Sequence, residues 1–380
     1  MKTAHKSRFA SRRAFIIAVA LCFPTLYAGS ATAQQHATKS VIVHTKFGGQ
    51  ILGFTIDPSG TEGLLSEYAG GTAATETFSQ TTGAIIAVVA EENNTLNDYA
   101  TQELDAPDLG LVLFQEKGQN NFLTLNPLTG NQFTGSWTPT VMSGYSISEI
   151  SVAQGTDVAV FENDLDADNA YVFSSNVAEN TFGTAFSLAS IIDVDEFLVD
   201  PEIAYDSTTN QAVLADSQDC PEPIPACATS IALVNLTTGD ITEFTDNLGV
   251  GQLSGLAVDP VGGFAVTTTT ADMGVEFYNL ATEKGKKVIL PGATSEIQSG
   301  TDVEFDPIHK LFLVSQYTST GDINDLQPRV YVYSEGAKLL ETVDIDLNIG
   351  IGGRIALNPS TRTGFLISVV QPMELQSFSY

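Results

Sequence analysis

The chain has 380 residues, of which 43% are hydrophobic, so it is long enough and apolar enough to bury a large core. Its 45 acidic residues far outnumber its 16 basic residues, which gives a net charge of −29. A surface of that sign repels phosphate backbones and argues against nucleic acid as a partner.

Residues 1–33 have the pattern of an export signal. A basic start precedes an apolar run over 14–28, which is too short to span a membrane, and Ala31–Ala33 fits the small-x-small cleavage rule. Ser11–Ile16 resembles the twin-arginine export motif, and the general secretory route is the alternative. We expect a periplasmic or extracellular protein with an N-terminal tail over 34–39 and no transmembrane segment after signal removal.

Removal of the signal leaves 11 basic residues against the same 45 acidic ones. Such acidity favours solubility in a saline or metal-rich medium, and cation binding is the second interpretation.

A short apolar strand that ends in an acidic or amide residue and a turn recurs seven times in the remaining chain. The clear copies centre on Asp57, Asp206, Asp259, Asp306 and Asn358, and the fainter ones on Asp105 and Gln154. We interpret the clear centres as turn formers, because Asp and Asn side chains accept hydrogen bonds from backbone amides two residues on. A period near fifty residues, built of short strands, is typical of a β-propeller.

Each repeat divides into four strands, which in the fifth copy are expected over 256–258, 264–268, 274–278 and 287–290. The predicted fold is therefore all-β: one seven-bladed β-propeller over 40–380, with six or eight blades as alternatives. The last repeat ends in its third strand, and Ser40–Lys46 is a spare strand before the first repeat. Pairing of the two would close the ring and remove an open sheet edge.

The hydrophobic-Asp-Pro turns at Asp57, Asp259 and Asp306 resemble the YVTN and NHL-type repeats of secreted bacterial propellers. The resemblance covers the whole chain after the signal. Members of these families include lactonases, lyases and binding modules, so the resemblance implies a fold and no single activity.

Four charged residues fall at or beside one repeat position, four residues before the centres. This predicted ring consists of Glu149, Glu202, Asp302 and Arg354, on strands that line the channel of a propeller. Crowded carboxylates need a counter-charge. Either Glu149, Glu202 and Asp302 bind Ca²⁺ or another divalent cation, as gluconolactonase-like propellers hold a metal, or Arg354 bridges the carboxylates.

A second acidic cluster contains Asp164, Asp166 and Asp168, which have the alternate spacing of the first half of a calcium loop. The glycine and the distal glutamate of such a loop are missing, so a solvated acidic turn is the alternative.

Two cysteines remain after signal removal, Cys220 and Cys227, and an exported chain favours a disulfide between them. The remaining histidines are His36, His44 and His309, and none falls at the predicted ring. A Ser-His-Asp arrangement is therefore not expected there.

These patterns favour an exported binding module that engages a small molecule, a glycan or a protein partner through the loops of one face. The first alternative is a divalent-metal-dependent, lactonase-like hydrolase or a lyase that uses the ring carboxylates. The second is a structural component of the cell envelope.

Overall fold

The computed structural model describes strands and their turns along most of the chain after residue 39. The described residues are 40–56, 61–70, 72–93, 104–106, 111–115, 122–125, 133–137, 149–152, 158–162, 171–176, 181–188, 202–217, 229–245, 253–269, 274–291, 300–319, 326–345, 352–368 and 374–380. Within these ranges every regular element is a β-strand, and no helix that could cross a membrane occurs among them.

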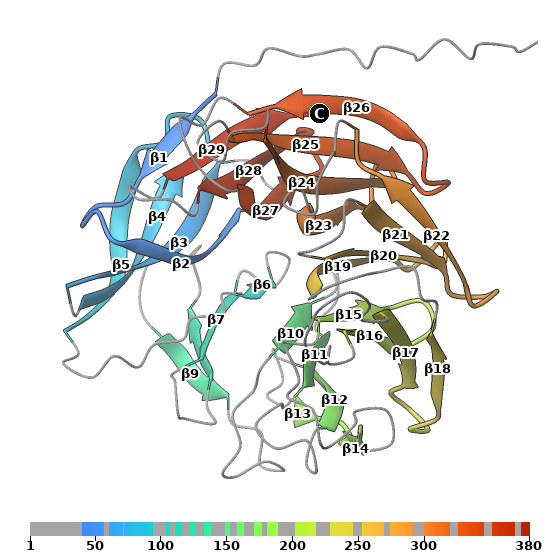
Figure 1. Ribbon diagram of the computed structural model, residues 1–380. Coiled ribbons are helices and arrows are strands. Elements are labelled where there is room, and N and C mark those ends of the chain that lie inside the picture. Colours follow the sequence, from blue (N-terminus) through green and yellow to red (C-terminus); the bar gives the residue numbers. More distant parts are fainter. Residues whose placement is uncertain are drawn as a thin grey trace, which may run out of the picture. The chain divides into compact units, whose positions relative to one another are not determined.

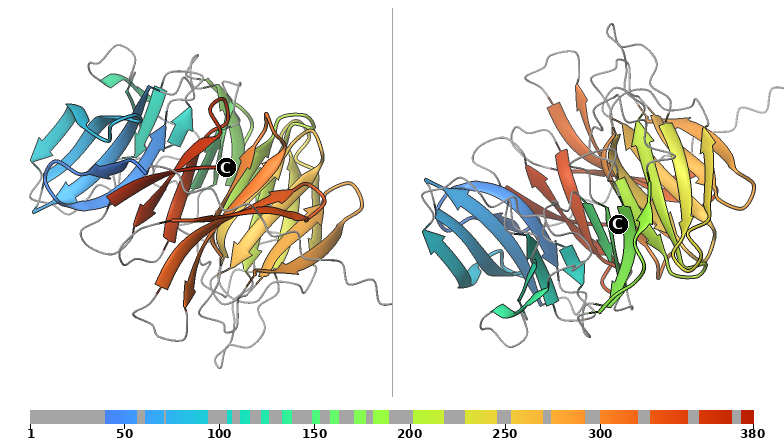
Figure 2. Two further views of the ribbon diagram at one scale, coloured as in Figure 1. Left: turned by 90° about the horizontal axis from the view of Figure 1, so that it is seen from above. Right: turned by 90° about the horizontal axis from the view of Figure 1, so that it is seen from below.

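The described strands form seven antiparallel sheets (Figures 1 and 2). The first three along the chain are β2 (Gln50–Ile56), β3 (Glu62–Ala69), β4 (Thr72–Ser79) and β5 (Ile85–Asn93); β6 (Leu104–Ala106), β7 (Leu111–Gln115), β8 (Phe122–Leu125) and β9 (Phe133–Trp137); and β10 (Glu149–Val152), β11 (Val158–Glu162), β12 (Tyr171–Asn176), β13 (Thr181–Phe182) and β14 (Phe186–Ser187).

The other four sheets complete the chain. They are β15 (Glu202–Asp206), β16 (Gln211–Ser217), β17 (Thr229–Asn235) and β18 (Ile241–Thr245); β19 (Leu253–Asp259), β20 (Phe264–Thr269), β21 (Gly274–Asn279) and β22 (Lys284–Ile289); β23 (Gly300–Asp306), β24 (Leu311–Ser319), β25 (Leu326–Ser334) and β26 (Leu339–Asp344); and β27 (Gly352–Asn358), β28 (Thr363–Ser368) and β29 (Glu374–Ser379) with β1 (Ile42–His44).

The predicted spare strand pairs with the last strand of the chain. Ile42 of β1 lies opposite Gln376 of β29, and Val43 lies opposite Leu375. Val43 is fully buried in an apolar cluster that joins β2, β3 and β4 with β28 and β29. The first sheet and the last sheet therefore share a core.

Four of the five clear centres form the turns between first and second strands, as predicted, and the fifth, Asp57, lies outside the described residues. Asp206, Asp259, Asp306 and Asn358 are all buried, and each side chain accepts a backbone N–H from the residue three positions on. The three aspartates also accept the N–H two positions on, over 2.8–3.0 Å. Buried carboxylates bonded to their own turn are structural, which confirms their interpretation as turn formers.

The residue four positions after each of these centres has a positive φ. This residue is Asn210, Gly263, Lys310 or Arg362, with φ between 54° and 70°. A left-handed residue at this place returns the chain into the second strand. The sequence pattern did not reveal it, because only one of the four is glycine.

The fourth strand of the fifth repeat begins three residues earlier than predicted, at Lys284 in place of Lys287. The Asn279 side chain accepts the Thr282 N–H over 2.9 Å, and Glu283 has a φ of 54°. The turn therefore closes before Gly285, which lies inside the strand opposite Tyr278.

Consecutive sheets pack against each other through apolar faces. One cluster joins Leu313, Val332 and Val343 of the sheet β23–β26 with Leu366 and Phe378 of β28 and β29. Similar clusters join β15–β18 to β19–β22, and β19–β22 to β23–β26. The first strands of these sheets lie side by side, β15 with β19, β19 with β23, and β23 with β27, and β2 contacts β27.

Candidate functional site

The predicted ring position lies next to a β-bulge in four of the first strands. One extra residue interrupts the antiparallel register between Ile51 and Gly53, between Leu253 and Gly255, between Gly300 and Asp302, and between Gly352 and Ile355. A bulge bends its strand and redirects the neighbouring side chains. At the ring position, successive side chains therefore do not simply alternate between the two faces of the sheet.

Asp302 ties two neighbouring sheets together. Its Oδ1 accepts the N–H of Val303 over 2.8 Å, and its Oδ2 accepts the N–H of Ile355, in β27, over 2.7 Å. Ser315, which lies opposite Asp302 in β24, donates its hydroxyl to the Gly353 carbonyl over 3.0 Å. The Asp302 carboxyl is therefore held in a fixed position at the junction of β23 and β27.

Glu202 and Arg354 both act on this carboxyl. Burial raises the pKa of Asp302 to about 7, the Ile355 N–H and the Arg354 charge lower it, and the negative charge of Glu202 raises it. Glu202 begins β15 and is half-buried, whereas Arg354 in β27 is exposed. Side chains from three sheets, far apart in sequence, therefore form one electrostatic cluster.

Gly255 allows this convergence. It lies in β19, between the strands of Glu202 and Asp302. A Cβ atom at this residue would be 3.0 Å from Asp302 Oδ1 and 2.9 Å from the Val303 nitrogen. Any side chain here would crowd the carboxyl, so the glycine provides the room for the cluster.

The remaining predicted site residues are not joined to this cluster by the described contacts. Glu149 begins β10, which lies beside β15. Its side chain lies outside the described part of the structure. Asp164, Asp166 and Asp168 fall in the connection between β11 and β12, outside the described residues, as do Cys220 and Cys227. The calcium loop and the disulfide therefore stay predictions.

No group of three or more His, Cys, Asp or Glu side chains that could hold a metal occurs among the described residues. Within them, Glu202 and Asp302 supply two carboxylates. A divalent cation at the ring would need further oxygen ligands beyond that pair.

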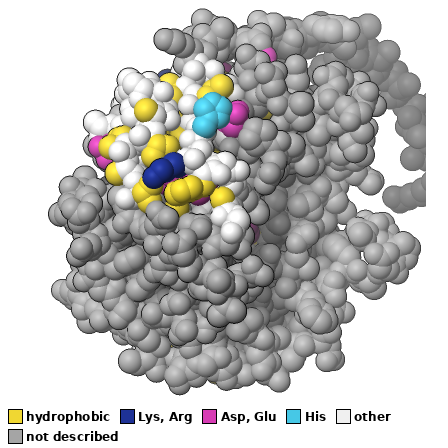
Figure 3. Space-filling view, turned by 90° about the vertical axis from the view of Figure 1, so that its left-hand side faces the viewer, with side chains coloured by type: hydrophobic (Ala, Val, Ile, Leu, Met, Phe, Trp, Pro, Cys, Tyr) yellow, Lys and Arg dark blue, Asp and Glu magenta, His cyan; other side chains and the backbone are white. Residues whose placement is uncertain are grey.

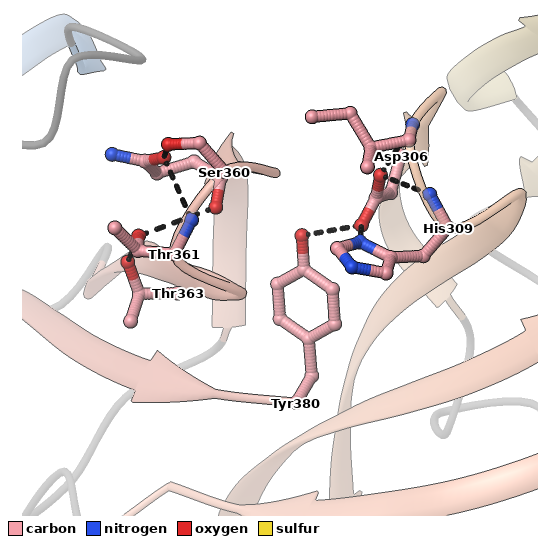
Figure 4. Close-up of polar contacts among 8 residues, drawn as sticks. Asp306, His309, Ser360, Thr361, Thr363 and Tyr380 are labelled. Carbon is pink, nitrogen blue, oxygen red and sulfur yellow. Dashed lines mark hydrogen bonds and ion pairs between the residues drawn. The ribbon is translucent and has the colours of Figure 1, made fainter.

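A second polar cluster surrounds the buried carboxylate of Asp306 (Figure 4). Its Oδ2 accepts the Tyr380 hydroxyl over 2.9 Å and lies 2.7 Å from His309 Nδ1. Burial raises the pKa of Tyr380, and the negative charge of Asp306 raises it further. Because the hydroxyl and the imidazole both contact Asp306, this arrangement is not a relay from hydroxyl to imidazole to carboxylate.

Comparison with known proteins identifies the fold. No family model matches the chain, and no curated protein matches its sequence. The solved WD40 repeats of RRP9 match with a TM-score of 0.60 at 12% identity, covering 91% of this chain and 98% of that one.

Two further solved structures give the same result. A chain of the mitotic checkpoint complex matches with a TM-score of 0.62 at 11% identity, over 97% of this chain and 99% of that one. The Myceliophteria thermophila Cps50 (Swd1) β-propeller domain matches with a TM-score of 0.60 at 10% identity, over 90% and 99%. Similarity at this level of identity concerns the fold alone. The chain has a β-propeller fold.

Proposed function

We propose that this protein is an exported, seven-bladed β-propeller, closed by β1, that works as a binding module for a protein partner. Seven described sheets and the β1–β29 pairing support this number of blades and this closure. The sequence pattern of residues 1–33 supports export. The YVTN and NHL-type resemblance is compatible with the same architecture.

The observation that carries the proposal is the cluster of Glu202, Asp302 and Arg354. Ionisable groups from three sheets interact where first strands adjoin, and Arg354 is exposed to solvent. The guanidinium supplies a counter-charge to the carboxylates and presents donors to a ligand. The excess of acidic residues favours a partner with a basic surface, because the field of the whole protein attracts it.

The second candidate function is a divalent-metal-dependent hydrolase. The observation in its favour is the proximity of two carboxylates, Glu202 and Asp302, to which Glu149 would add a third. For this function the cation, rather than Arg354, would neutralise the negative charge of the ring carboxylates and polarise a carbonyl group of the substrate.

Metal analysis separates the two functions. For the binding module, the purified mature protein should contain far less than one equivalent of divalent metal, and a chelator should leave its melting temperature unchanged. A bound metal stabilises the folded state by mass action, so a metal enzyme should lose several degrees of melting temperature on chelation. One tightly bound equivalent that Glu202→Gln removes would refute the binding module and support the hydrolase.

A further inference from the structure

Two glutamates are fully buried in the first sheet, away from the candidate site. Glu67 lies on β3 and Glu76 on β4, and neither side chain is accessible to solvent. Glu76 stands opposite Leu65, two residues from Glu67 along β3, so both glutamates lie on one face of the sheet. Buried acidic side chains are uncommon and need compensating partners.

The partners come from the segment that joins β1 to β2. The Phe47 N–H donates to Glu67 Oε1 over 2.8 Å, and the Gly49 N–H donates to Glu67 Oε2 over 3.0 Å. The Lys46 N–H donates to Glu76 Oε2 over 3.1 Å. Gly48 has a φ of 68°, which turns the segment over the two carboxyl groups.

One oxygen of the pair has no donor. Glu76 Oε1 is buried without a hydrogen-bond partner. Two adjacent carboxylates cannot both stay ionised in a buried site, so a proton shared between Glu76 and Glu67 forms a hydrogen bond within the pair and removes the repulsion. Burial raises the pKa of Glu76 to about 7, and Glu67 raises it further, whereas the Lys46 N–H and charge lower it.

We propose that Glu67, Glu76 and the amides of Lys46, Phe47 and Gly49 form an acid latch, which holds the closing strand β1 against the protein while the glutamate pair keeps one proton. Loss of the proton leaves two buried negative charges beneath the segment. Opening the segment lets water reach them, so deprotonation favours the open form. The latch is thus a pH-sensitive device for the strand that joins the first sheet to the last.

The direction of the pH effect follows from proton counting. The closed latch retains its proton up to about pH 7, whereas an opened, solvated Glu76 titrates near its ordinary pKa of 4.5. The closed form is therefore fully favoured at acidic pH. The closed form loses stability relative to the open form as the pH rises from 4.5 to about 7, and the loss levels off above about pH 7.

Other ionisable groups lie on the surrounding elements. His44 of β1 contacts Glu374 of β29 over 3.0 Å, and its side chain is 68% exposed. Lys46 lies over the Phe47 ring, at 5.1 Å from its centroid, and Glu62 is exposed. Glu91 of β5 stands opposite Ala74 in the register. The His44–Glu374 pair matters most, because it joins β1 to β29 and is an ion pair only when the imidazole carries a proton.

Figure 3 shows the side of the molecule on which the first sheet lies. A basic side chain lies among hydrophobic side chains on this surface, and a histidine lies against an acidic side chain. Opening the latch would expose Val43, which is buried, and would leave the edge of β29 unpaired. An unpaired strand edge is a template for pairing with another chain.

Hydrogen exchange of the peptide covering 40–49 tests this inference in the full mature chain. After correction for the intrinsic pH dependence of amide exchange, wild-type protection should fall by up to about 100-fold between about pH 5 and about pH 7, and then level off. Glu76→Gln, which is neutral at every pH, should abolish this fall. His44→Gln should retain it.

Glu276→Gln provides the matched control, because Glu276 is a fully buried glutamate on β21, away from the β1–β2 segment. This variant should leave the fall in residues 40–49 intact. The inference is overturned if Glu76→Gln keeps the fall or if His44→Gln removes it. If Glu76→Gln fails to fold, His44→Gln decides alone. Protection of residues 40–49 that does not change with pH in this variant would exclude the latch.

Discussion

Deleting residues 34–47 is expected to lower the free energy of unfolding by about 3 to 6 kcal/mol, because a paired strand and a buried side chain are lost. Val43 is fully buried in the cluster shared by the first and last sheets. The Val41 N–H donates to Ser377 Oγ over 2.7 Å, and the Ser377 N–H donates to the Val41 carbonyl over 2.9 Å. Chemical denaturation of the mature and shortened chains measures the difference.

Two point variants within β1 show whether burial is the cause. Val43→Ala should cost about 1 to 3 kcal/mol, whereas Ile42→Ala, at a residue that is 39% exposed, should cost much less. An unchanged unfolding midpoint for the deletion would contradict the closure of the propeller by β1.

Asp306→Ala is expected to be among the most damaging single substitutions, with a loss of about 3 to 5 kcal/mol. The substitution removes a buried acceptor of the Ile308 and His309 N–H groups, the His309 ring and the Tyr380 hydroxyl. The buried Tyr380 hydroxyl then loses its partner, and the turn over Ile308 and His309 loses the acceptor that holds it. Thermal and urea unfolding measure the loss.

Tyr380→Phe and Asp240→Ala are two comparison variants with smaller expected losses of stability. The first removes one hydrogen bond to Asp306 and should cost about 1 kcal/mol. The second removes an exposed aspartate from another turn and should cost less than about 1 kcal/mol. If Asp306→Ala were no more harmful than Asp240→Ala, the structural role of the buried turn aspartates would be wrong.

The repeat could be predicted from the sequence because its signal is local. An apolar strand followed by Asp or Asn encodes both the strand and its turn, and the copies at Asp206, Asp259 and Asp306 have the same hydrogen bonds. The pairing of Ser40–Lys46 with the last strand followed from counting strands. Such inferences need only neighbouring residues and a period.

The parts that escaped prediction depend on contacts between distant segments. Glu67 belongs to a residue type that is seldom buried, yet it is fully buried, because the Phe47 and Gly49 N–H groups reach it from 20 and 18 residues away. Ser315 is held by Gly353, 38 residues later. The bulges beside the ring position also leave no signal in composition or period.

The most direct test of the candidate site is the titration of the Asp302 carboxyl, followed by carbon-13 NMR in three proteins. In the wild type, burial should place the pKa of Asp302 at about 7. Glu202→Gln should lower this pKa, because a neighbouring negative charge is lost, and Arg354→Gln should raise it, because the counter-charge is lost. Identical titration curves in all three proteins would show that the residues do not share one site and would contradict the proposed binding site.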